Sequence, residues 1–263
     1  MSIYGYASAQ ALGSETNSTR QQKSPVRVDE FLESYLPTDL TFEDHNGNTV
    51  TSSSLLANGK PTILTFVYYR CPAACTLLLN GLTEALHAHD FRLGEDFNLV
   101  TISVDARETM ELASAKRNTY IDQLPANQAH DPEAWRFLTG SRSAIESITN
   151  AVGYRFVYNP DSMQYDHPSV LMFVSPTGQL KRYLYGSYFQ PDNVRFAFLE
   201  AGNGALGTLS ERLALCFYDF GTPEVGRRYA LNKQRLLLVL VGGSATLAAV
   251  LWFIVGWSRR RGT

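Results

Sequence analysis

The clearest pattern in the chain is a nearly unbroken run of apolar, β-branched and aromatic residues at positions 62–69, TILTFVYY. Such a run is typical of a central strand that is covered on both faces. After it, Leu78, Leu82, Ala85 and Leu86 recur at the spacing of one helix face. The sequence therefore predicts a buried strand that leads directly into a helix.

Strand and helix patterns alternate along the rest of the central region. Ser143 and Glu146 have the spacing of a capping box at the start of one helix. This alternation, followed by a hairpin and a last helix, predicts an α/β fold with a mixed sheet flanked by helices. The strands are expected at 40–42, 49–51, 62–69, 97–104, 135–139, 169–175 and 179–185, and the helices after 71 and at 107–121, 143–152 and 191–199.

The two ends of the chain differ from this central domain, which we place at 28–202. Residues 1–27 are polar and rich in Ser, Gln, Thr and Asn, which predicts disorder. Residues 203–235 carry glycine and charge without clear periodicity and are expected to be a linker. Residues 236–257 contain no charge, and about 20 apolar residues suffice to cross a bilayer as a helix. We therefore expect one C-terminal transmembrane helix, followed by a basic tail at 258–263.

Charge and cysteine content limit the possible functions. A formal net charge of −2 gives no electrostatic case for nucleic-acid binding. Three cysteines are too few for a disulfide scaffold, so the close pair Cys71 and Cys75 indicates chemistry. The pair lies at the predicted helix start, where Pro72 suits the first position and the positive end of the helix dipole favours thiolate.

Cys71 and Cys75 are four residues apart, so they face the same side of a helical turn. Two thiolates suit a soft ion, and Cu(I) is the softest plausible candidate. A closed structural zinc site would need four ligands, and the chain has only one short-spaced cysteine pair. A third ligand would complete a trigonal copper site.

One histidine is placed differently from the others. His167 lies in Tyr165-Asp166-His167-Pro168, just before a predicted strand, although such a histidine alone is more often packed or exposed than a ligand. The other histidines fall in a hairpin turn, near a helix end or in a polar loop, and surface exposure is expected for His45, His87, His89 and His130. Cys216 is expected to be a buried or interfacial thiol.

Together these motifs resemble the Sco/SenC family over roughly residues 37–200. Members of that family are thioredoxin-like, membrane-tethered copper proteins that help to assemble the dinuclear copper centre of cytochrome c oxidase. The resemblance implies a thioredoxin-like domain in which Cys71, Cys75 and His167 hold copper; Cu(I) is expected, and binding of Cu(II) is left open. It rests on the apolar strand, Cys71-Pro-x-x-Cys75, Ile102-Ser-Val-Asp105, Trp135-Arg-Phe-Leu-Thr-Gly140 and Asp166-His167.

The resemblance also implies partners and a location. The expected partners are the copper-site subunit of the oxidase and, through residues 236–257, membrane lipid, with the domain on the extracytoplasmic (periplasmic) side. Two features depart from the family pattern: Thr76 stands where a second proline is common, and the predicted anchor is C-terminal. Asp105 matches a recurring acidic position, but a structural role as the cap of the helix that begins near Arg107 is favoured.

Two enzymatic functions remain as alternatives. A thiol–disulfide oxidoreductase would use Cys71 and Cys75 without metal. A peroxide-reducing enzyme would use one of them as the attacking thiolate. The oxidoreductase needs no histidine, so a change at His167 separates it from copper binding, whereas the peroxide-reducing enzyme would require a peroxide-dependent rate. In addition, thioredoxin-like folds commonly place a cis proline before the strand that faces the cysteines, and Pro168 holds that place, so a cis bond there is one expectation to test.

Overall fold

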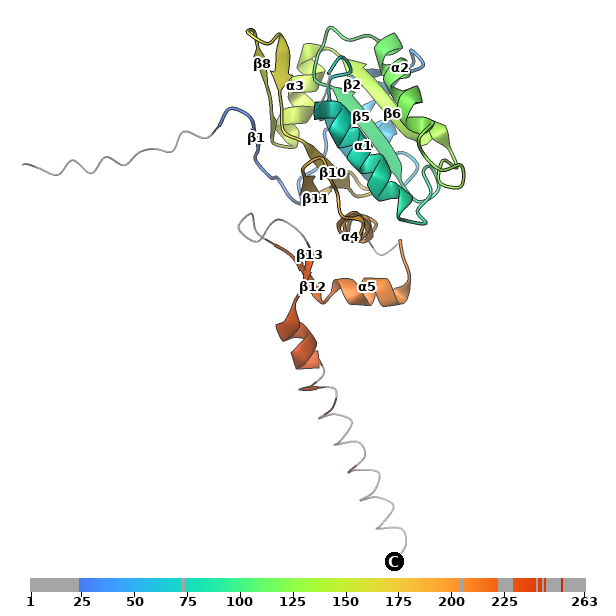
Figure 1. The fold of residues 1–263 in the computed structure, drawn as a ribbon, viewed down its shortest axis with the longest axis vertical. Helices are drawn as coiled ribbons and strands as arrows, with labels where there is room; N and C mark the ends of the chain where they lie inside the picture. The colour runs from blue at the N-terminus through green and yellow to red at the C-terminus, as the bar shows by residue number, and fades with distance from the viewer. Residues whose placement is uncertain are drawn as a thin grey trace, which may run out of the picture.

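The computed structural model describes residues 24–71, 74–203, 206–221, 229–239, 241–242, 244 and 252, and it shows a mixed α/β domain (Figure 1). The elements in chain order are β1 (Arg27–Val28), β2 (Thr41–Asp44), β3 (Thr49–Thr51), a 3₁₀ turn (Ser52–Leu55), β4 (Thr62–Val67), α1 (Ala74–His87), β5 (Asn98–Ser103), α2 (Met110–Ile121), a second 3₁₀ turn (Pro132–Ala134), β6 (Trp135–Gly140), α3 (Arg142–Ala151), β7 (Tyr154–Arg155), β8 (Val157–Asn159), β9 (Gln164–Asp166), β10 (Val170–Val174), β11 (Leu180–Tyr185), α4 (Pro191–Ala201), α5 (Leu209–Leu215), β12 (Tyr218–Phe220) and β13 (Tyr229–Leu231).

Seven of these strands form the central sheet, in the order β11-β10-β4-β5-β6-β2-β3. Strands β4, β5 and β6 run parallel, and the other neighbours pair antiparallel. Every residue of β4, β5 and β10 is buried, which explains why their sequences are continuous apolar runs rather than alternating ones. The predicted mixed sheet is confirmed.

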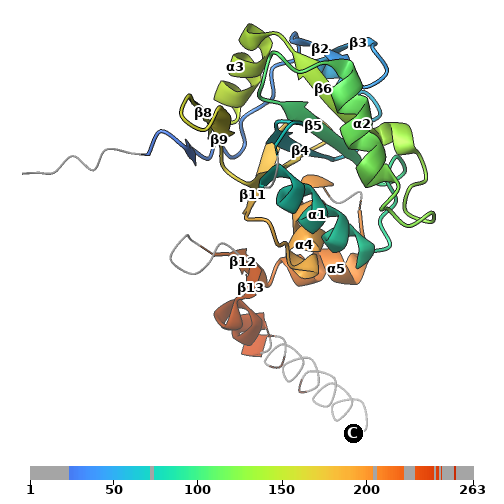
Figure 2. The ribbon, with the colours of Figure 1, turned by 45° about the horizontal axis from the view of Figure 1, so that its top comes forward.

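The helices flank this sheet. Helix α1 packs between α2 and α4, while α2 lies on β6 and α4 on β10 and β11. Helix α3 lies apart from this layer, beside β7 (Figure 2). The arrangement agrees with the thioredoxin-like architecture expected from the sequence.

Local capping determines where the helices begin. Ser141 is the N-cap of α3, because its Oγ accepts a hydrogen bond from the Ala144 amide at 3.2 Å. The predicted capping box at Ser143 and Glu146 is therefore wrong, and the helix begins at Arg142. Pro191 stands in the first turn of α4, where its missing amide hydrogen costs nothing.

The predicted linker at 203–235 contains secondary structure that its composition does not reveal. Helix α5 begins with a capping box at Thr208, and β12 pairs with β13. The Tyr229 hydroxyl in β13 donates a hydrogen bond to Glu200 of α4. Part of this segment therefore packs against the domain instead of merely connecting it to the C-terminus.

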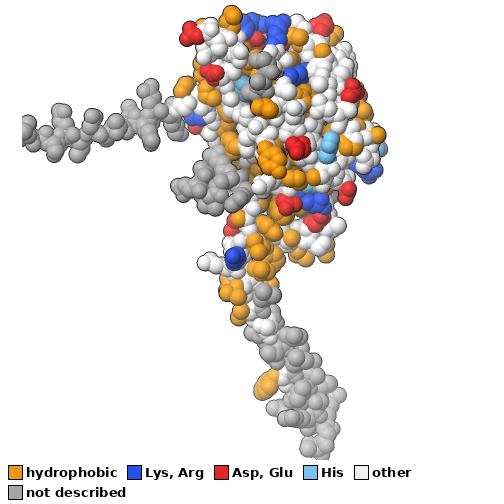
Figure 3. Space-filling model, viewed as in Figure 1, with side chains coloured by type: hydrophobic (Ala, Val, Ile, Leu, Met, Phe, Trp, Pro, Cys, Tyr) orange, Lys and Arg blue, Asp and Glu red, His pale blue; other side chains and the backbone are white. Residues whose placement is uncertain are grey.

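Apolar side chains gather on the C-terminal part of the molecule, over the β12–β13 hairpin and the helical residues 233–239 (Figure 3). None of the helices that the structure describes has the length and hydrophobicity of a membrane span. Most of the predicted transmembrane segment 236–257, the tail 258–263 and residues 1–23 of the predicted disordered segment lie outside the described residues. The exposed apolar residues include Leu209, Leu213, Leu231, Leu237 and Leu238.

Candidate metal centre

The cysteine pair lies where the buried strand β4 passes into α1. Cys71 follows the strand by a short turn and Cys75 is in the first turn of the helix. Both side chains are buried, with 7% and 0% exposure, and no disulfide joins them. The Cys75 amide donates a hydrogen bond to Cys71 Sγ at 3.4 Å, so the first sulfur satisfies one of the unpaired amides of the helix start. The sequence thus places both thiols at the end of the same central strand.

His167 reaches this pair from the opposite direction, in the connection between β9 and β10. Its Nε2 lies 3.0 Å from Cys75 Sγ. The potential ligand atoms of Cys71, Cys75 and His167 all lie within 4.8 Å of one another, and the imidazole is half-buried. The fold therefore brings together the three residues that the sequence singled out, although 92 positions separate Cys75 from His167.

Tyr154 orients the imidazole. Its hydroxyl lies 2.9 Å from the Pro168 carbonyl, which can only accept, and 3.0 Å from His167 Nδ1. The consistent assignment has the tyrosine donating to Pro168 and Nδ1–H donating to the tyrosine oxygen. Nε2 then keeps its lone pair, accepts from the Cys75 thiol and is available to a metal. Sequence reasoning missed Tyr154, because nothing in its local pattern distinguishes it from a core aromatic.

Without metal, the Cys75 thiol holds its proton tightly. The hydrogen bond between Cys71 and Cys75, together with burial, raises the pKa of the Cys75 thiol. The sequence-based expectation that the helix dipole favours thiolate is therefore wrong for Cys75. Burial, and then the hydrogen bond to Cys71, likewise raises the pKa of Tyr68, whose ring meets the His167 ring edge-on at a centroid distance of 5.9 Å.

A buried carboxylate fixes the backbone that carries Cys71. Glu108 Oε2 accepts from the Tyr69 amide at 2.6 Å and Oε1 from the Arg70 amide at 2.8 Å. Ser103 Oγ donates to the same carboxylate at 2.6 Å. Charge-assisted bonds of this kind hold a loop more firmly than neutral ones. Sequence reasoning missed Glu108, and only its position shortly after a buried strand gives a signal.

Asp105 is not part of the cysteine–histidine group. Its carboxylate receives the Arg107 amide at 3.0 Å and the Arg107 side chain at 2.8 Å, and Tyr165 donates to it at 3.4 Å. Burial alone would raise the pKa of Asp105, but the hydrogen bonds from Arg107 outweigh burial and hold the pKa below its ordinary value. Thr109, not Asp105, is the N-cap of α2. Asp105 therefore has the structural role, although it stabilises a turn and not the helix end.

Two of the histidines expected at the surface are buried. His45 is 3% exposed, and its Nε2 lies 3.2 Å from Glu133; His89 is 6% exposed and bonds to the Pro191 carbonyl at 2.8 Å. Those two expectations were wrong because tertiary packing covers a turn and a helix end that look polar in sequence. His87 and His130 are exposed, as expected.

Cys216 is exposed, so the expectation of a buried thiol is wrong, while a place at an interface stays a prediction. The expectation of a cis bond before Pro168 also fails. The His167–Pro168 bond is trans, since the described residues contain no cis peptide bond. The path that presents His167 Nε2 to Cys75 is made with an ordinary trans backbone.

Comparison with known proteins gives one family. The sequence profile of the SCO1/SenC family matches residues 33–195. No curated protein sequence matches the chain. Among solved structures, the chain is similar to a candidate electron transfer protein from Aquifex aeolicus VF5 (26% identity, TM-score 0.58, covering 66% of this chain and 95% of that one).

Two other solved structures are similar at lower identity. A SCO1/SenC family lipoprotein from Bacillus anthracis has 19% identity and a TM-score of 0.51, covering 66% of this chain and 99% of that one. ScoI of Arabidopsis thaliana, solved with copper bound, has 24% identity and a TM-score of 0.47, covering 60% of this chain and 92% of that one.

Proposed function

Because the chain belongs to the SCO1/SenC family, we propose that it is a copper-binding assembly factor. It takes up Cu(I) through Cys71, Cys75 and His167 and delivers the ion to the dinuclear copper site of a cytochrome c oxidase. The observation that carries this proposal is the convergence of two sulfurs and one imidazole nitrogen within 4.8 Å.

The donor set fits Cu(I) in chemical terms. Thiolate sulfur is a soft ligand and imidazole suits copper, whereas hard ions prefer oxygen. Among the described residues the group has three members, while a closed zinc site needs four. Tyr154 holds the imidazole with Nε2 available, and Glu108 fixes the turn before Cys71. The thiols must lose their protons to bind copper, so affinity falls as the pH falls.

The same two thiols support a second candidate function, the reduction of a disulfide in the copper acceptor. Cys71 and Cys75 would form a disulfide and pass two electrons and two protons to the acceptor's cysteines. The observation in favour is that the two thiols are close: their sulfur atoms lie within 4.8 Å of each other, and the Cys75 amide donates a hydrogen bond to Cys71 Sγ at 3.4 Å. The alternative to a copper-binding protein is a thiol–disulfide oxidoreductase that uses this pair without metal.

We further propose that the domain, residues 28–202, is held at a membrane by a helix at 236–257 and faces the extracytoplasmic (periplasmic) side. Support comes from the uncharged sequence of that segment and from exposed apolar side chains among the described residues that precede it in the chain, including Leu209 and Leu213. Protease added to intact spheroplasts should digest the domain. Full protection of the domain would place it on the cytoplasmic side and reverse the proposal.

Copper content tests the site. The full chain, purified in a neutral detergent and reduced, should bind one Cu(I) per chain. Cys71→Ser and Cys75→Ser should abolish tight binding, because a hydroxyl is a poor ligand for a soft ion. Cys216→Ser is the matched control: its thiol is exposed and outside the group, so copper content should not change. An unchanged copper content in Cys71→Ser would refute the site.

His167→Ala separates copper binding from metal-free dithiol chemistry. The variant should bind copper more weakly while its Cys71–Cys75 disulfide still forms and is still reduced. His130→Ala, a change at an exposed histidine, is the control. If copper affinity is unchanged in His167→Ala and only the redox potential moves, the oxidoreductase function is the correct one.

A further inference from the structure

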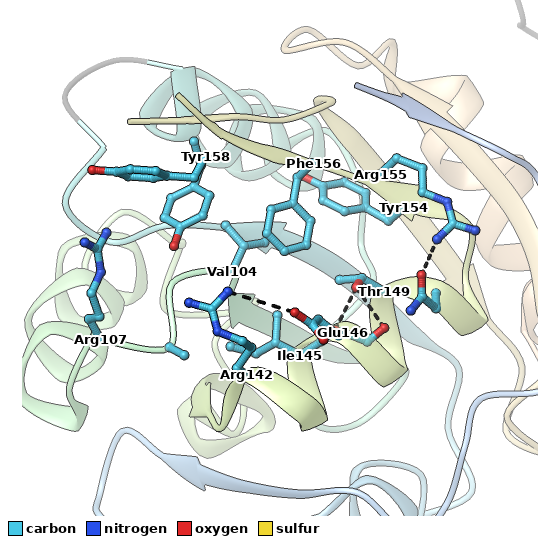
Figure 4. A pocket seen from close by; sticks show the side chains of 13 residues that line it. Val104, Arg107, Arg142, Ile145, Glu146, Thr149, Tyr154, Arg155, Phe156 and Tyr158 are labelled. Carbon is cyan, nitrogen blue, oxygen red and sulfur yellow. Dashed lines mark hydrogen bonds and ion pairs between the residues drawn. The ribbon is translucent and has the colours of Figure 1, made fainter. Parts of the chain in front are cut away.

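A cavity of about 600 Å³ lies beside the metal centre, between α3 and the strands β7 to β9 (Figure 4). Its apolar part is formed by Val104, Ile145 and Phe156, and Figure 4 shows the Phe156 ring above the other two side chains. The volume falls in the range of ligand-binding pockets and exceeds that of a single side chain. No residue of the proposed copper group lines it.

The charged side chains of this cavity are predominantly basic. Three arginines line it, Arg107, Arg142 and Arg155, against one acidic residue, Glu146. Arg107 is held by Asp105 and lies over the Tyr158 ring, 5.2 Å from the centroid. Figure 4 shows Arg107 and Arg142 on the same side of the cavity. Two guanidinium groups therefore border one end of a cavity whose lining mixes polar and apolar side chains.

Arg142 is the cation most available to a ligand. Its ion pair with Glu146 spans 3.9 Å, and both side chains are exposed, by 77% and 56%. An exposed pair at that separation contributes little energy. Arginine prefers a bidentate pair of hydrogen bonds to a carboxylate. Glu146 is too distant from Arg142 to form such a pair. An incoming carboxylate can therefore replace Glu146 at small cost.

Two tyrosines that line the cavity connect it to the metal centre. Tyr154 lines the cavity, and its hydroxyl bonds to His167 Nδ1 at 3.0 Å. Tyr165 also lines it and packs on the Tyr68 ring at a centroid distance of 5.8 Å, while Tyr68 in turn meets His167. A segment bound in the cavity would lie one side chain away from the proposed copper ligand.

We propose that this cavity binds an acidic, apolar peptide segment of the protein that accepts the copper. A carboxylate would pair with Arg142, in a cavity that Arg107 also makes basic, and a neighbouring apolar side chain would cover Phe156 and Ile145. A peptide fits better than a free metabolite because Arg107 and Arg142 are 60% and 77% exposed, whereas small-molecule sites enclose most of their ligand. This inference rests on the proposed function, since it names a docking surface for the copper acceptor.

Peptide binding to the full chain tests the inference. The probe is a fluorescent, capped hexapeptide Ser-Asp-Leu-Glu-Leu-Ser, and the comparison peptide carries Asn and Gln in place of Asp and Glu. Fluorescence anisotropy should show that only the acidic peptide binds and that added salt weakens it. Arg142→Gln should weaken it about tenfold, the loss of one charge-assisted contact. Arg92→Gln, on an exposed arginine outside the cavity, should change affinity less than about twofold.

Reversing the charge at Arg142 gives a more discriminating test of the docking inference. Arg142→Glu should reject the acidic peptide and bind a peptide with Lys at both acidic positions, and the helix start should tolerate an acidic residue. Copper content is measured on the same samples and should stay at the wild-type value. Loss of copper from the wild type would refute the proposed function, whatever the peptide does. Equal binding of the neutral peptide, equal effects of Arg142→Gln and Arg92→Gln, or displacement of the peptide by free succinate at equal affinity would each overturn the docking inference.

Discussion

Tyr154→Phe is the change that most sharply separates the orientation of His167 from the packing of the domain. The variant keeps the aromatic ring; Tyr154 is 1% exposed, and its ring packs against that of Phe66, tilted by 37°, at a centroid distance of 4.8 Å. It removes only the hydroxyl that bonds to His167 Nδ1 and to the Pro168 carbonyl. The imidazole then loses the partner that fixes its tautomer and its direction.

The loss of these contacts should change both the free energy of unfolding and the free energy of Cu(I) binding. His167 and Pro168 are half-buried, so water replaces part of the lost bonding, and the free energy of unfolding should fall by about 1–2 kcal/mol. Residues that orient a metal-ligating histidine typically contribute about 10–100-fold to metal affinity. At about 1.4 kcal/mol for each factor of ten, the loss in Cu(I) binding should be about 1.4–2.8 kcal/mol.

Competition with a chromophoric Cu(I) chelator measures the affinity, and urea unfolding of the copper-free chain measures stability. Tyr183→Phe is the matched control, because that tyrosine is also 1% exposed and its hydroxyl bonds to the Val152 carbonyl at 3.0 Å instead of to His167. It should lose stability and keep copper affinity. If Tyr154→Phe binds copper as tightly as Tyr183→Phe does, the orienting role of Tyr154 is wrong.

Three other predictions concern the stability of the domain. Glu108→Gln should lower the free energy of unfolding by about 1–3 kcal/mol in urea titrations, because the carboxylate that receives two backbone amides is lost; equal stability would contradict this role. Burial lowers the pKa of His45, so the unfolded chain takes up a proton at higher pH than the folded domain does. The contribution of neutral His45 to the free energy of unfolding should therefore be fully present above about pH 6.5 and be lost as the pH falls toward the lower pKa of the folded state. His45→Gln should reduce that loss. Gly153→Ala should lower the melting temperature, since Gly153 has φ +67° and a methyl group there would collide with the Asp29 carbonyl; an unchanged Tm would contradict this.

Much of the fold could be predicted because its strands carry unambiguous patterns. The continuous apolar runs of β4, β5 and β10 are buried along their whole length, and the helices α1, α2 and α4 lie close to their predicted positions. The short elements β8, β9, α5, β12 and β13 could not be predicted. Such elements have few residues with which to show a period, and their stability comes from contacts distant in sequence, such as that of Tyr229 with Glu200.

The same distinction holds at the metal centre. The spacing of Cys71 and Cys75 and the position of His167 before a strand were visible in the sequence. Tyr154 and Glu108 were not, because each acts across the fold: Tyr154 is 13 positions from His167 and Glu108 is 38 from Arg70. Burial of His45 and the raised pKa of Cys75 were missed for a related reason, since both depend on how tertiary packing excludes water.

X-ray absorption at the copper edge, on the full chain reduced and loaded with one equivalent of Cu(I), identifies the copper ligands directly. We expect Cu(I) bound by two sulfur atoms and one imidazole nitrogen. His167→Ala should remove the imidazole signal, while Cys216→Ser should leave the spectrum unchanged. A wild-type spectrum without imidazole scattering, or one with the same imidazole signal in His167→Ala, would contradict the assignment of Cys71, Cys75 and His167 as the copper ligands.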